Sequence, residues 1–129
     1  MSRDYRLYLD DIIEAIRRIK DFTNGMEFDA FKADIKTQDA VVRNLEIIGE
    51  ASGRLPEAVR RAAPEIEWRK VVGIRNILAH GYFGISLPII WDVVQNKLDE
   101  LSDACLHLVS ESGDKGLGYP PNGNNSETT

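Results

Sequence analysis

The sequence predicts an all-α fold, a helical bundle built on four main helices and followed by a flexible tail. Apolar residues recur at intervals of three and four residues through most of the chain, which is typical of helices with one buried face. The chain has neither an alternating strand pattern of useful length nor an internal repeat. Composition changes at Ser112, after which Gly, Pro, Asn, Ser and Thr dominate and cannot form a core. We therefore expect a helical domain over residues 1–111 and a disordered tail over 112–129.

The first half of the chain predicts two long helices joined by a short one. Apolar side chains from Tyr5 to Ile19 share one helix face, and Gly25 can adopt the left-handed conformation that ends a helix. Residues 28–35 predict one or two helical turns. A second long helix is expected to start near Thr37. It has a stripe of apolar residues and, late in its course, small residues that let another helix approach closely; these are Gly49, Ala51, Ser52 and Gly53.

The second half predicts a short helix and two further long ones. Leu55–Pro56 begins a short helical piece that ends before Pro64. The segment Pro64–Trp68 is typical of a helix entry, and this helix should run to about His80, with Gly81 after it. The last helix should open at Ser86, as N-cap, and carry one apolar stripe from Leu87 to Leu108.

Composition and charge limit the class of protein. The 129 residues are 43% hydrophobic and 29% charged, as in a soluble globular domain, and no apolar run reaches the ~20 residues that span a bilayer. The N-terminus has no secretory signal pattern, and the single Cys105 excludes an internal disulfide or a cysteine zinc site, so we expect a cytoplasmic protein. A net charge of -5 argues against a broad basic surface, so any contact with RNA needs a local basic cleft.

One arginine interrupts an apolar stripe. Trp68, Val72, Arg75 and Ala79 follow one another by four, three and four residues, which places Arg75 on the apolar face. Burying a guanidinium without a partner is costly, so Arg75 should meet an acid, an anion or a water-lined cleft. Glu46 and Glu50, one turn apart on the second long helix, are its candidate partners.

A histidine follows that arginine and suggests acid–base chemistry. His80 lies five residues after Arg75, a rotation of roughly 140° on a regular helix, whereas Asn76 and His80 share a face. An imidazole can accept a proton at neutral pH and a guanidinium can hold a phosphate, so the pair permits RNA cleavage without a metal. The competing interpretation is that Arg75 and His80 only cap carbonyls and complement the helix dipole.

The remaining candidates have simpler interpretations from residue type. Tyr82 and His107 fit packing roles, or for His107 an interaction with the helix dipole, and Cys105 fits a small buried hydrophobe. Trp68 and Trp91 fit core anchors.

The segment from Arg75 to Tyr82 resembles the RX4HXY motif of HEPN-domain proteins, and more narrowly the HepT-like family. Residues 43–51, RNLEIIGEA, resemble the second-helix signature of that family, and Pro64–Trp68 resembles its helix entry, followed by Arg75-Asn76 and then Trp91. The likeness extends over roughly residues 5 to 110.

The resemblance implies a HEPN-type bundle of four or five helices that forms a homodimer, with the motif in a cleft near the dimer interface. It implies a metal-independent endoribonuclease, the toxin of a type VII-like toxin–antitoxin system. Carried onto this sequence, Arg75 and His80 become the catalytic pair and Asn76 a supporting polar group.

The resemblance also gives Tyr82 a role. The expected partner is a minimal nucleotidyltransferase antitoxin that transfers AMP from ATP to this tyrosine and so silences the toxin. ATP and magnesium would serve that partner, and the chain itself needs no cofactor or metal. Two alternatives stay open: a non-catalytic helical dimer that binds nucleotide, RNA or a partner protein through the same cleft, and a structural dimerisation domain in which Arg75 pairs with Glu46 or Glu50.

Overall fold

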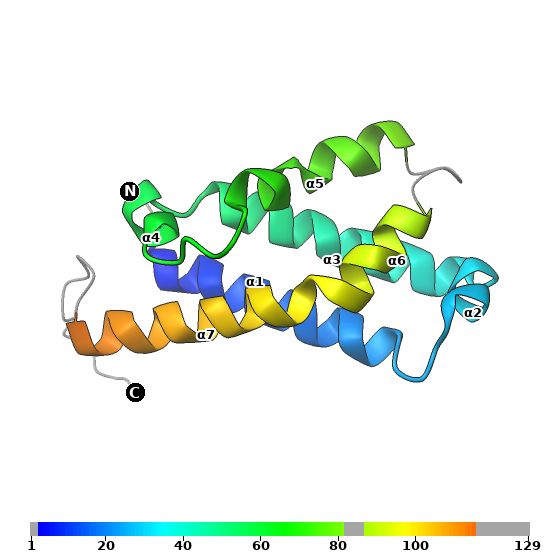
Figure 1. The fold of residues 1–129 in the computed structure, drawn as a ribbon, viewed down its shortest axis with the longest axis horizontal. Helices are drawn as coiled ribbons and strands as arrows, with labels where there is room; N and C mark the ends of the chain where they lie inside the picture. Colours follow the sequence, from blue (N-terminus) through cyan, green and yellow to red (C-terminus); the bar gives the residue numbers. More distant parts are fainter. Residues whose placement is uncertain (1–2, 82–86, 116–129) are drawn as a thin grey trace.

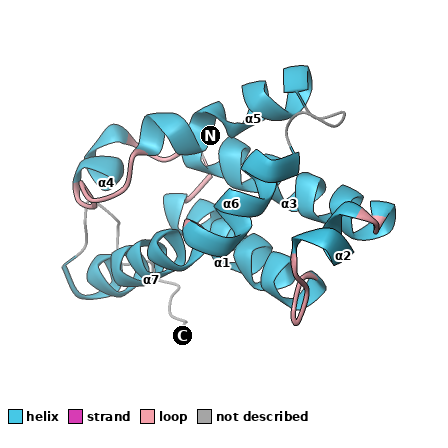
Figure 2. Cartoon of the chain, turned by 45° about the vertical axis from the view of Figure 1, so that its right-hand side comes forward, coloured by secondary structure: helices cyan, strands magenta, loops and turns pink. Residues whose placement is uncertain are grey.

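The computed structural model describes residues 3–81 and 87–115, and for positions 79–81 and 113–115 it describes the backbone alone. The described residues form seven helices and no strand (Figures 1 and 2). In chain order these are α1 (Tyr5–Phe22), α2 (Phe28–Lys32), α3 (Ile35–Gly53), α4 (Glu57–Arg61), α5 (Trp68–Gly81), α6 (Leu87–Asn96) and α7 (Leu98–Lys115). The predicted all-α bundle is confirmed.

Helix α3 is the central element of the bundle. It packs against α1 on one side and α5 on the other, and α1 in turn packs against α7 (Figure 1). The short α2 and α6 contact each other near one end of α3. Helix α5 therefore lies at the edge of the bundle opposite α1 and α7.

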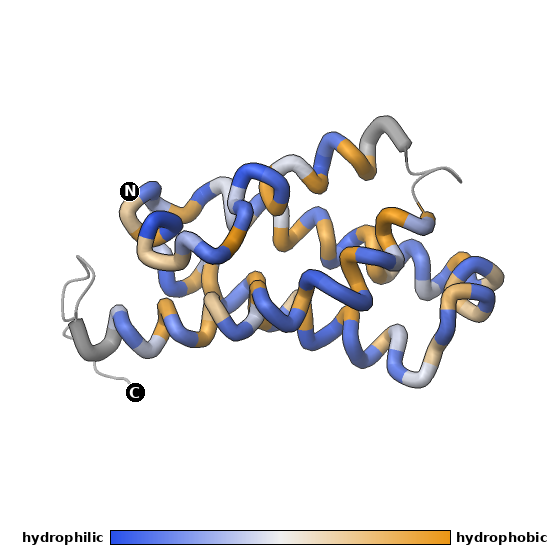
Figure 3. Tube along the Cα trace, viewed as in Figure 1, coloured by the Kyte–Doolittle hydropathy of each residue, from blue (hydrophilic) through white to orange (hydrophobic). Residues whose placement is uncertain are grey.

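The core lies between α1, α3 and α7, where the apolar stripes predicted from spacing meet. Its fully buried members include Leu9, Ile12, Ile16 and Ile19 of α1, Val41, Leu45 and Ile48 of α3, and Cys105 and Leu108 of α7. Apolar and polar residues alternate along these helices with helical period (Figure 3). Burial of these stripes is the main force that holds the helices together.

Local side-chain contacts set the ends of the helices. Asp4 caps α1, where its carboxylate accepts a hydrogen bond from the Arg6 amide at 3.0 Å, and Gly25 has a φ of 79° just after the helix, as predicted. Helix α3 begins at Ile35, before the predicted start at Thr37, because Asp34 accepts hydrogen bonds from both the Thr37 amide and its hydroxyl.

The prediction of one continuous last helix is wrong. The helix is interrupted by a turn at Lys97, between α6 and α7, although the Lys97 amide still donates to the Val93 carbonyl at 3.0 Å. The turn lets α6 lean on α2, where the Trp91 and Phe31 rings lie 4.8 Å apart, while α7 follows α1. One straight helix could not reach both partners.

Helix α7 continues to Lys115, past the predicted start of the tail at Ser112. Ser112 is buried, and its hydroxyl donates to the Val109 carbonyl at 2.8 Å. The rest of the predicted tail, from residue 116, lies outside the described residues. No helix in the described ranges has the length and apolar character needed to cross a membrane.

Candidate functional site

Helix α5 carries the motif, and Trp68 fixes where it begins. The Trp68 side chain is only 8% exposed, and its indole N–H donates to the Ala63 carbonyl at 3.1 Å. This bond closes the turn formed by residues 64–67, so α5 starts at Trp68 rather than near Pro64 as the entry signal predicted. Trp68 is the core anchor that the sequence predicts, and its hydrogen bond also fixes the segment that leads into α5.

Helices α3 and α5 cross at two glycines, as the small residues of α3 predict. A Cβ atom placed on Gly49 would lie 3.1 Å from the Arg75 Cγ atom and 3.5 Å from the Val71 carbonyl oxygen. One turn later, a Cβ on Gly53 would lie 3.6 Å from Val72. The bare backbone at Gly49 therefore makes room for the aliphatic stem of Arg75.

A surface hollow opens beside this crossing, between α3 and α5. Its volume is about 630 Å³, and its lining residues are Val42, Glu46, Arg69, Val72, Gly73, Arg75, Asn76 and Leu78. Three predicted site residues, Glu46, Arg75 and Asn76, thus lie around one hollow. The hollow is wide enough for a small polar ligand or part of a polymer.

The hollow has a locally basic lining in an acidic protein. Arg69 and Arg75 contribute two positive charges and Glu46 one negative charge, a formal balance of +1 against -5 for the whole chain. Six other arginines each lie within 4.0 Å of a carboxylate: Arg3, Arg6, Arg17, Arg18, Arg54 and Arg61. Arg69 and Arg75 have no such ion pair with any described residue, so their guanidinium groups remain open to an anion.

The structure separates Arg75 from one of its two candidate partners. The Arg75 side chain is exposed, because its stem occupies the apolar stripe while its charged end meets the hollow. Glu50 does not line this hollow: its carboxylate accepts a hydrogen bond from Arg54 at 3.4 Å and lines a separate hollow with Tyr8 and Asp11. The dry Arg75–Glu pair of the purely structural hypothesis is absent from the described residues.

The two other motif residues lie at the end of α5. The helix includes His80 and continues to Gly81, so its backbone keeps the helical register in which Asn76 and position 80 share a face. The side chain of His80 and all of Tyr82 lie outside what the structure describes. The predicted roles of these two residues therefore stay predictions.

Residues given simpler interpretations behave mostly as ordinary core and surface groups. Trp91 stacks on Phe31, and its ring lies 6.4 Å from that of Phe28. Cys105 is fully buried, and burial raises the pKa of its thiol to about 12, which keeps it protonated and unreactive. His107 is exposed, with its Nε2 atom 3.6 Å from a Glu111 carboxylate oxygen.

Reasoning from the sequence missed Arg69. This residue lines the hollow beside Asn76, although it lies outside the motif. Its spacing could have indicated this, because residues seven apart lie on the same helix face, and Asn76 follows Arg69 by seven. Within the described part of the chain, no cluster of three or more His, Cys, Asp or Glu side chains could hold a metal ion.

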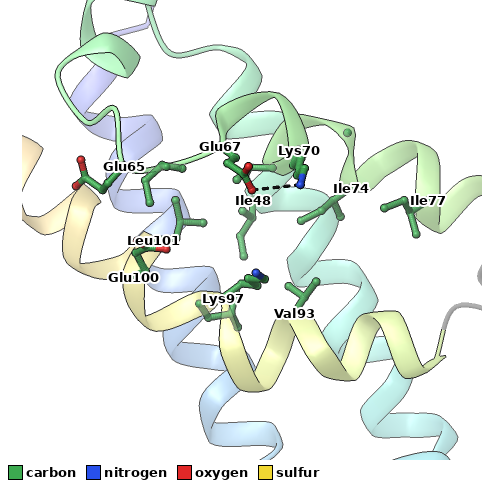
Figure 4. A pocket seen from close by; sticks show the side chains of 14 residues that line it. Ile48, Glu65, Glu67, Lys70, Ile74, Ile77, Val93, Lys97, Glu100 and Leu101 are labelled. Carbon is green, nitrogen blue, oxygen red and sulfur yellow. Dashed lines mark ion pairs between the residues drawn. The ribbon is translucent and has the colours of Figure 1, made fainter.

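A second hollow, mostly apolar, lies on the opposite flank of α5. It has a volume of about 520 Å³ and separates α5 from the junction of α6 and α7 (Figure 4). Ile74 and Ile77 of α5 lie across it from Val93, Ile48 and Leu101 also line it, and the Glu67–Lys70 ion pair lies at its edge. Ile77 is 41% exposed, so α5 presents apolar surface to solvent here.

Comparisons with known proteins agree with the motif. No solved structure matches the chain at a significant level. Among curated proteins, the chain is 49% identical over 97 residues to "Putative RNase MJ0127" of Methanocaldococcus jannaschii, covering 75% of this chain and 80% of that protein. It is 45% identical over 101 residues to "Probable ribonuclease HepT" of Thermococcus cleftensis, covering 78% and 92%.

A more distant bacterial relative extends the set. "Putative RNase TTE0752" of Caldanaerobacter subterraneus is 35% identical over 96 residues, covering 74% of this chain and 86% of that protein. The model of the family described as "Ribonuclease HepT-like" matches residues 12–108, which include α3, α5 and the hollow between them. The chain therefore belongs to the ribonuclease HepT-like family.

Proposed function

We propose that this chain is an endoribonuclease that cleaves RNA without a metal, through Arg75 and His80. The observation that carries the proposal is the hollow beside α5, where Arg75 and Asn76 lie with no acid paired to the arginine, on the helix that continues to His80. The names of the relatives, which describe ribonucleases, support the same reaction.

The chemistry follows from the groups that RNA itself supplies. The His80 imidazole removes the proton of a ribose 2′-hydroxyl, and the 2′-oxygen attacks the adjacent phosphorus. The bond from phosphorus to the 5′-oxygen of the next nucleotide breaks, and that oxygen takes up a proton from the His80 imidazolium or from water, which leaves a 2′,3′-cyclic phosphate and a 5′-hydroxyl end. The Arg75 guanidinium stabilises the charge that builds up on the phosphate oxygens, and Asn76 supplies a further polar contact.

The test is RNA cleavage by the purified protein in the presence of a metal chelator. We expect wild-type protein to produce cyclic-phosphate ends, and His80→Ala to lose activity by a factor on the order of 10²–10⁴. Equal cleavage by both proteins would indicate a contaminating enzyme and contradict the proposal.

The second candidate is a non-catalytic dimer that binds nucleotide, RNA or a protein through the same hollow. It is favoured by the angular separation of Arg75 and position 80 on α5, because residues five apart on a regular helix do not share a face. Binding of RNA with no product, retained in His80→Ala, would support this candidate over the nuclease.

The biological role we propose is that of the toxin of a type VII-like toxin–antitoxin pair. A cognate minimal nucleotidyltransferase would transfer AMP from ATP, bound with magnesium, to the Tyr82 hydroxyl: the phenolic oxygen bonds to the α-phosphorus and pyrophosphate leaves. The attached phosphate would then compete with RNA for Arg75. Family membership supports this role, and Tyr82 follows α5 directly in the sequence.

Co-expression tests this control. Intact-mass measurement of the chain produced together with a cognate minimal nucleotidyltransferase should show added AMP units, located on Tyr82 by peptide sequencing and absent from Tyr82→Phe. An unmodified Tyr82 in the presence of an active partner and ATP would exclude this mode of control while leaving the nuclease proposal intact.

We further propose that the chain acts as a homodimer. The exposed Ile77 and the apolar hollow on its flank of α5 support this, because a second copy placed there would exclude water from apolar surface.

A further inference from the structure

The second arginine of the hollow and a glycine beside it extend the site along α5. On a regular helix, positions 69, 73, 76 and 80 fall within roughly 60° of one another, so Arg69, Gly73, Asn76 and the register of His80 form one row. The row spans about 16 Å along the helix axis. Arg69 and Asn76 both line the hollow that contains Arg75.

Gly73 lies in the middle of this row, and no contact inside the described chain accounts for it. Among the described residues, a Cβ atom on Gly73 would meet no atom within 4 Å beyond its chain neighbours and the adjoining backbone of α5, whereas one on Gly49 would press on Arg75. A glycine inside a helix weakens that helix relative to alanine, because it adds conformational freedom to the unfolded chain. The bare backbone therefore leaves space for something outside the chain.

Arg69, beside this space, indicates that its ligand is an anion. It is exposed, lines the hollow and has no ion pair within 4.0 Å among the described residues, while six other arginines of the chain do. An arginine next to open helix backbone is suited to a phosphate, which it can hold with two parallel hydrogen bonds. Glu46, on the other wall, carries a negative charge that would repel a phosphate placed next to it.

We propose that a ribose–phosphate backbone lies along this row, passing over Gly73, and that Arg69 binds a phosphate remote from the cleaved bond. The inference rests on the proposed ribonuclease function and names the path of its substrate. Arg69 and Gly73 are then binding residues: they set affinity for RNA and its direction along α5, and take no part in bond breaking.

The experiment measures binding apart from cleavage. Binding of full-length protein to a fluorescent single-stranded RNA with 2′-O-methyl groups at every position, which cannot react, is titrated over a series of salt concentrations. We expect Arg69→Gln to weaken binding roughly tenfold and to reduce the slope of log affinity against log salt by about 0.7, the loss of one single-strand phosphate contact. Arg61→Gln, which changes an arginine on α4, is the matched control and should bind as wild type does.

Gly73 is tested by opposite effects on stability and binding. Gly73→Ala should raise the Tm by a few degrees and yet weaken RNA binding, and Gly73→Gln, with a larger side chain, should weaken it further. Gly53→Ala is the matched control, because its Cβ would make an ordinary contact with Val72 at 3.6 Å. It should leave RNA affinity unchanged.

The outcomes separate this inference from the proposed function. If wild-type protein cleaves RNA while Arg69→Gln and both Gly73 variants bind as it does, the path along α5 is wrong and the nuclease proposal stands. If these variants change the sedimentation of the protein without changing RNA affinity, the row contacts a second protein copy, and the inference is also wrong. A wild-type protein that neither binds nor cleaves RNA would overturn both.

Discussion

Arg75 has two roles that act on different parts of one side chain. Its Cγ atom lies on Gly49 within the crossing of α3 and α5, and the side chain lines the hollow where we propose that phosphate binds. The stem therefore contributes to packing, and in the proposed reaction the guanidinium contributes to the chemistry. Substitutions that separate the stem from the charge can measure the two contributions independently.

We expect Arg75→Gln to fold almost normally and to lose activity. Glutamine keeps the Cβ and Cγ atoms over Gly49, so the free energy of unfolding should change by less than about 0.5 kcal/mol. RNA cleavage should fall by a factor on the order of 10² or more. Arg75→Ala also removes the Cγ methylene and should cost about 1 kcal/mol of stability. Urea unfolding checks the stabilities, and equal destabilisation by the two variants would contradict the role of the stem.

At the scale of the element, the spacing of apolar residues is a good predictor of which residues of a helix are buried. It is a poorer predictor of where the helix bends and of which neighbouring helix it faces. The apolar stripes of α1, α3 and α7 lie in the core, since burial follows the helical period. The turn at Lys97 was not predictable, because the apolar stripe continues through it. Glu46 and Glu50 were equivalent in the sequence, and only the crossing at Gly49 decides that Glu46 reaches the hollow.

The end of α1 gives a prediction about backbone conformation. Gly25 has a φ of 79°, and a Cβ atom on it would meet no described atom within 4 Å apart from its chain neighbours. Gly25→Ala should therefore lower the free energy of unfolding by about 1–2 kcal/mol through backbone strain alone. Gly25→Asn should recover most of the loss, because asparagine tolerates this conformation. Thermal unfolding of the three proteins provides the measurement, and full stability of Gly25→Ala would mean that the turn is not held in this conformation.

The exposed face of α1 gives a prediction about pH. Hydrogen bonds from Arg17 and Arg18 lower the pKa of Glu14 from 4.5 to about 2. Because the folded-state pKa is the lower one, Glu14 contributes its full stability above pH 4.5 and loses it as the pH falls toward 2. Glu14→Gln should have a slightly lower Tm than wild type at neutral pH, with a difference that vanishes near pH 2. The effect is small since the group is exposed. If the difference in Tm between the two proteins were the same at pH 2 as at neutral pH, the effect would not come from the charge of Glu14.

At the scale of the whole molecule, α5 is held mainly from one side. It packs on α3, while its other flank borders the apolar hollow shared with α6 and α7 (Figure 4). The sequence predicted the helix and its motif, but it could not show that this flank stays open, because exposure depends on how far α6 and α7 stand from α5. The sequence likewise predicted a basic cleft without its full lining, and only the packing of α5 on α3 shows that Arg69 lines it.

If the second copy covers this flank, Ile77→Glu should weaken the dimer. A carboxylate at a site that becomes buried would cost at least about 1.4 kcal/mol, a tenfold loss in dimer affinity, measurable by sedimentation velocity over a range of concentrations. Leu106→Glu is the control, because Leu106 is 52% exposed on α7 and lies away from this hollow. A dimer that tolerates Ile77→Glu as well as Leu106→Glu would place the interface elsewhere.

The contact between Gly49 and Arg75 has a consequence for how this protein can change over evolutionary time. The two positions share a fixed volume, so a lineage that gives up the guanidinium for a short side chain leaves a gap above residue 49. An alanine or serine at position 49 would refill that gap, although either would crowd the arginine while it is present. Size at positions 49 and 75 should therefore covary inversely among relatives, and a small residue at 75 beside a larger one at 49 would mark a copy that has abandoned catalysis while keeping its fold.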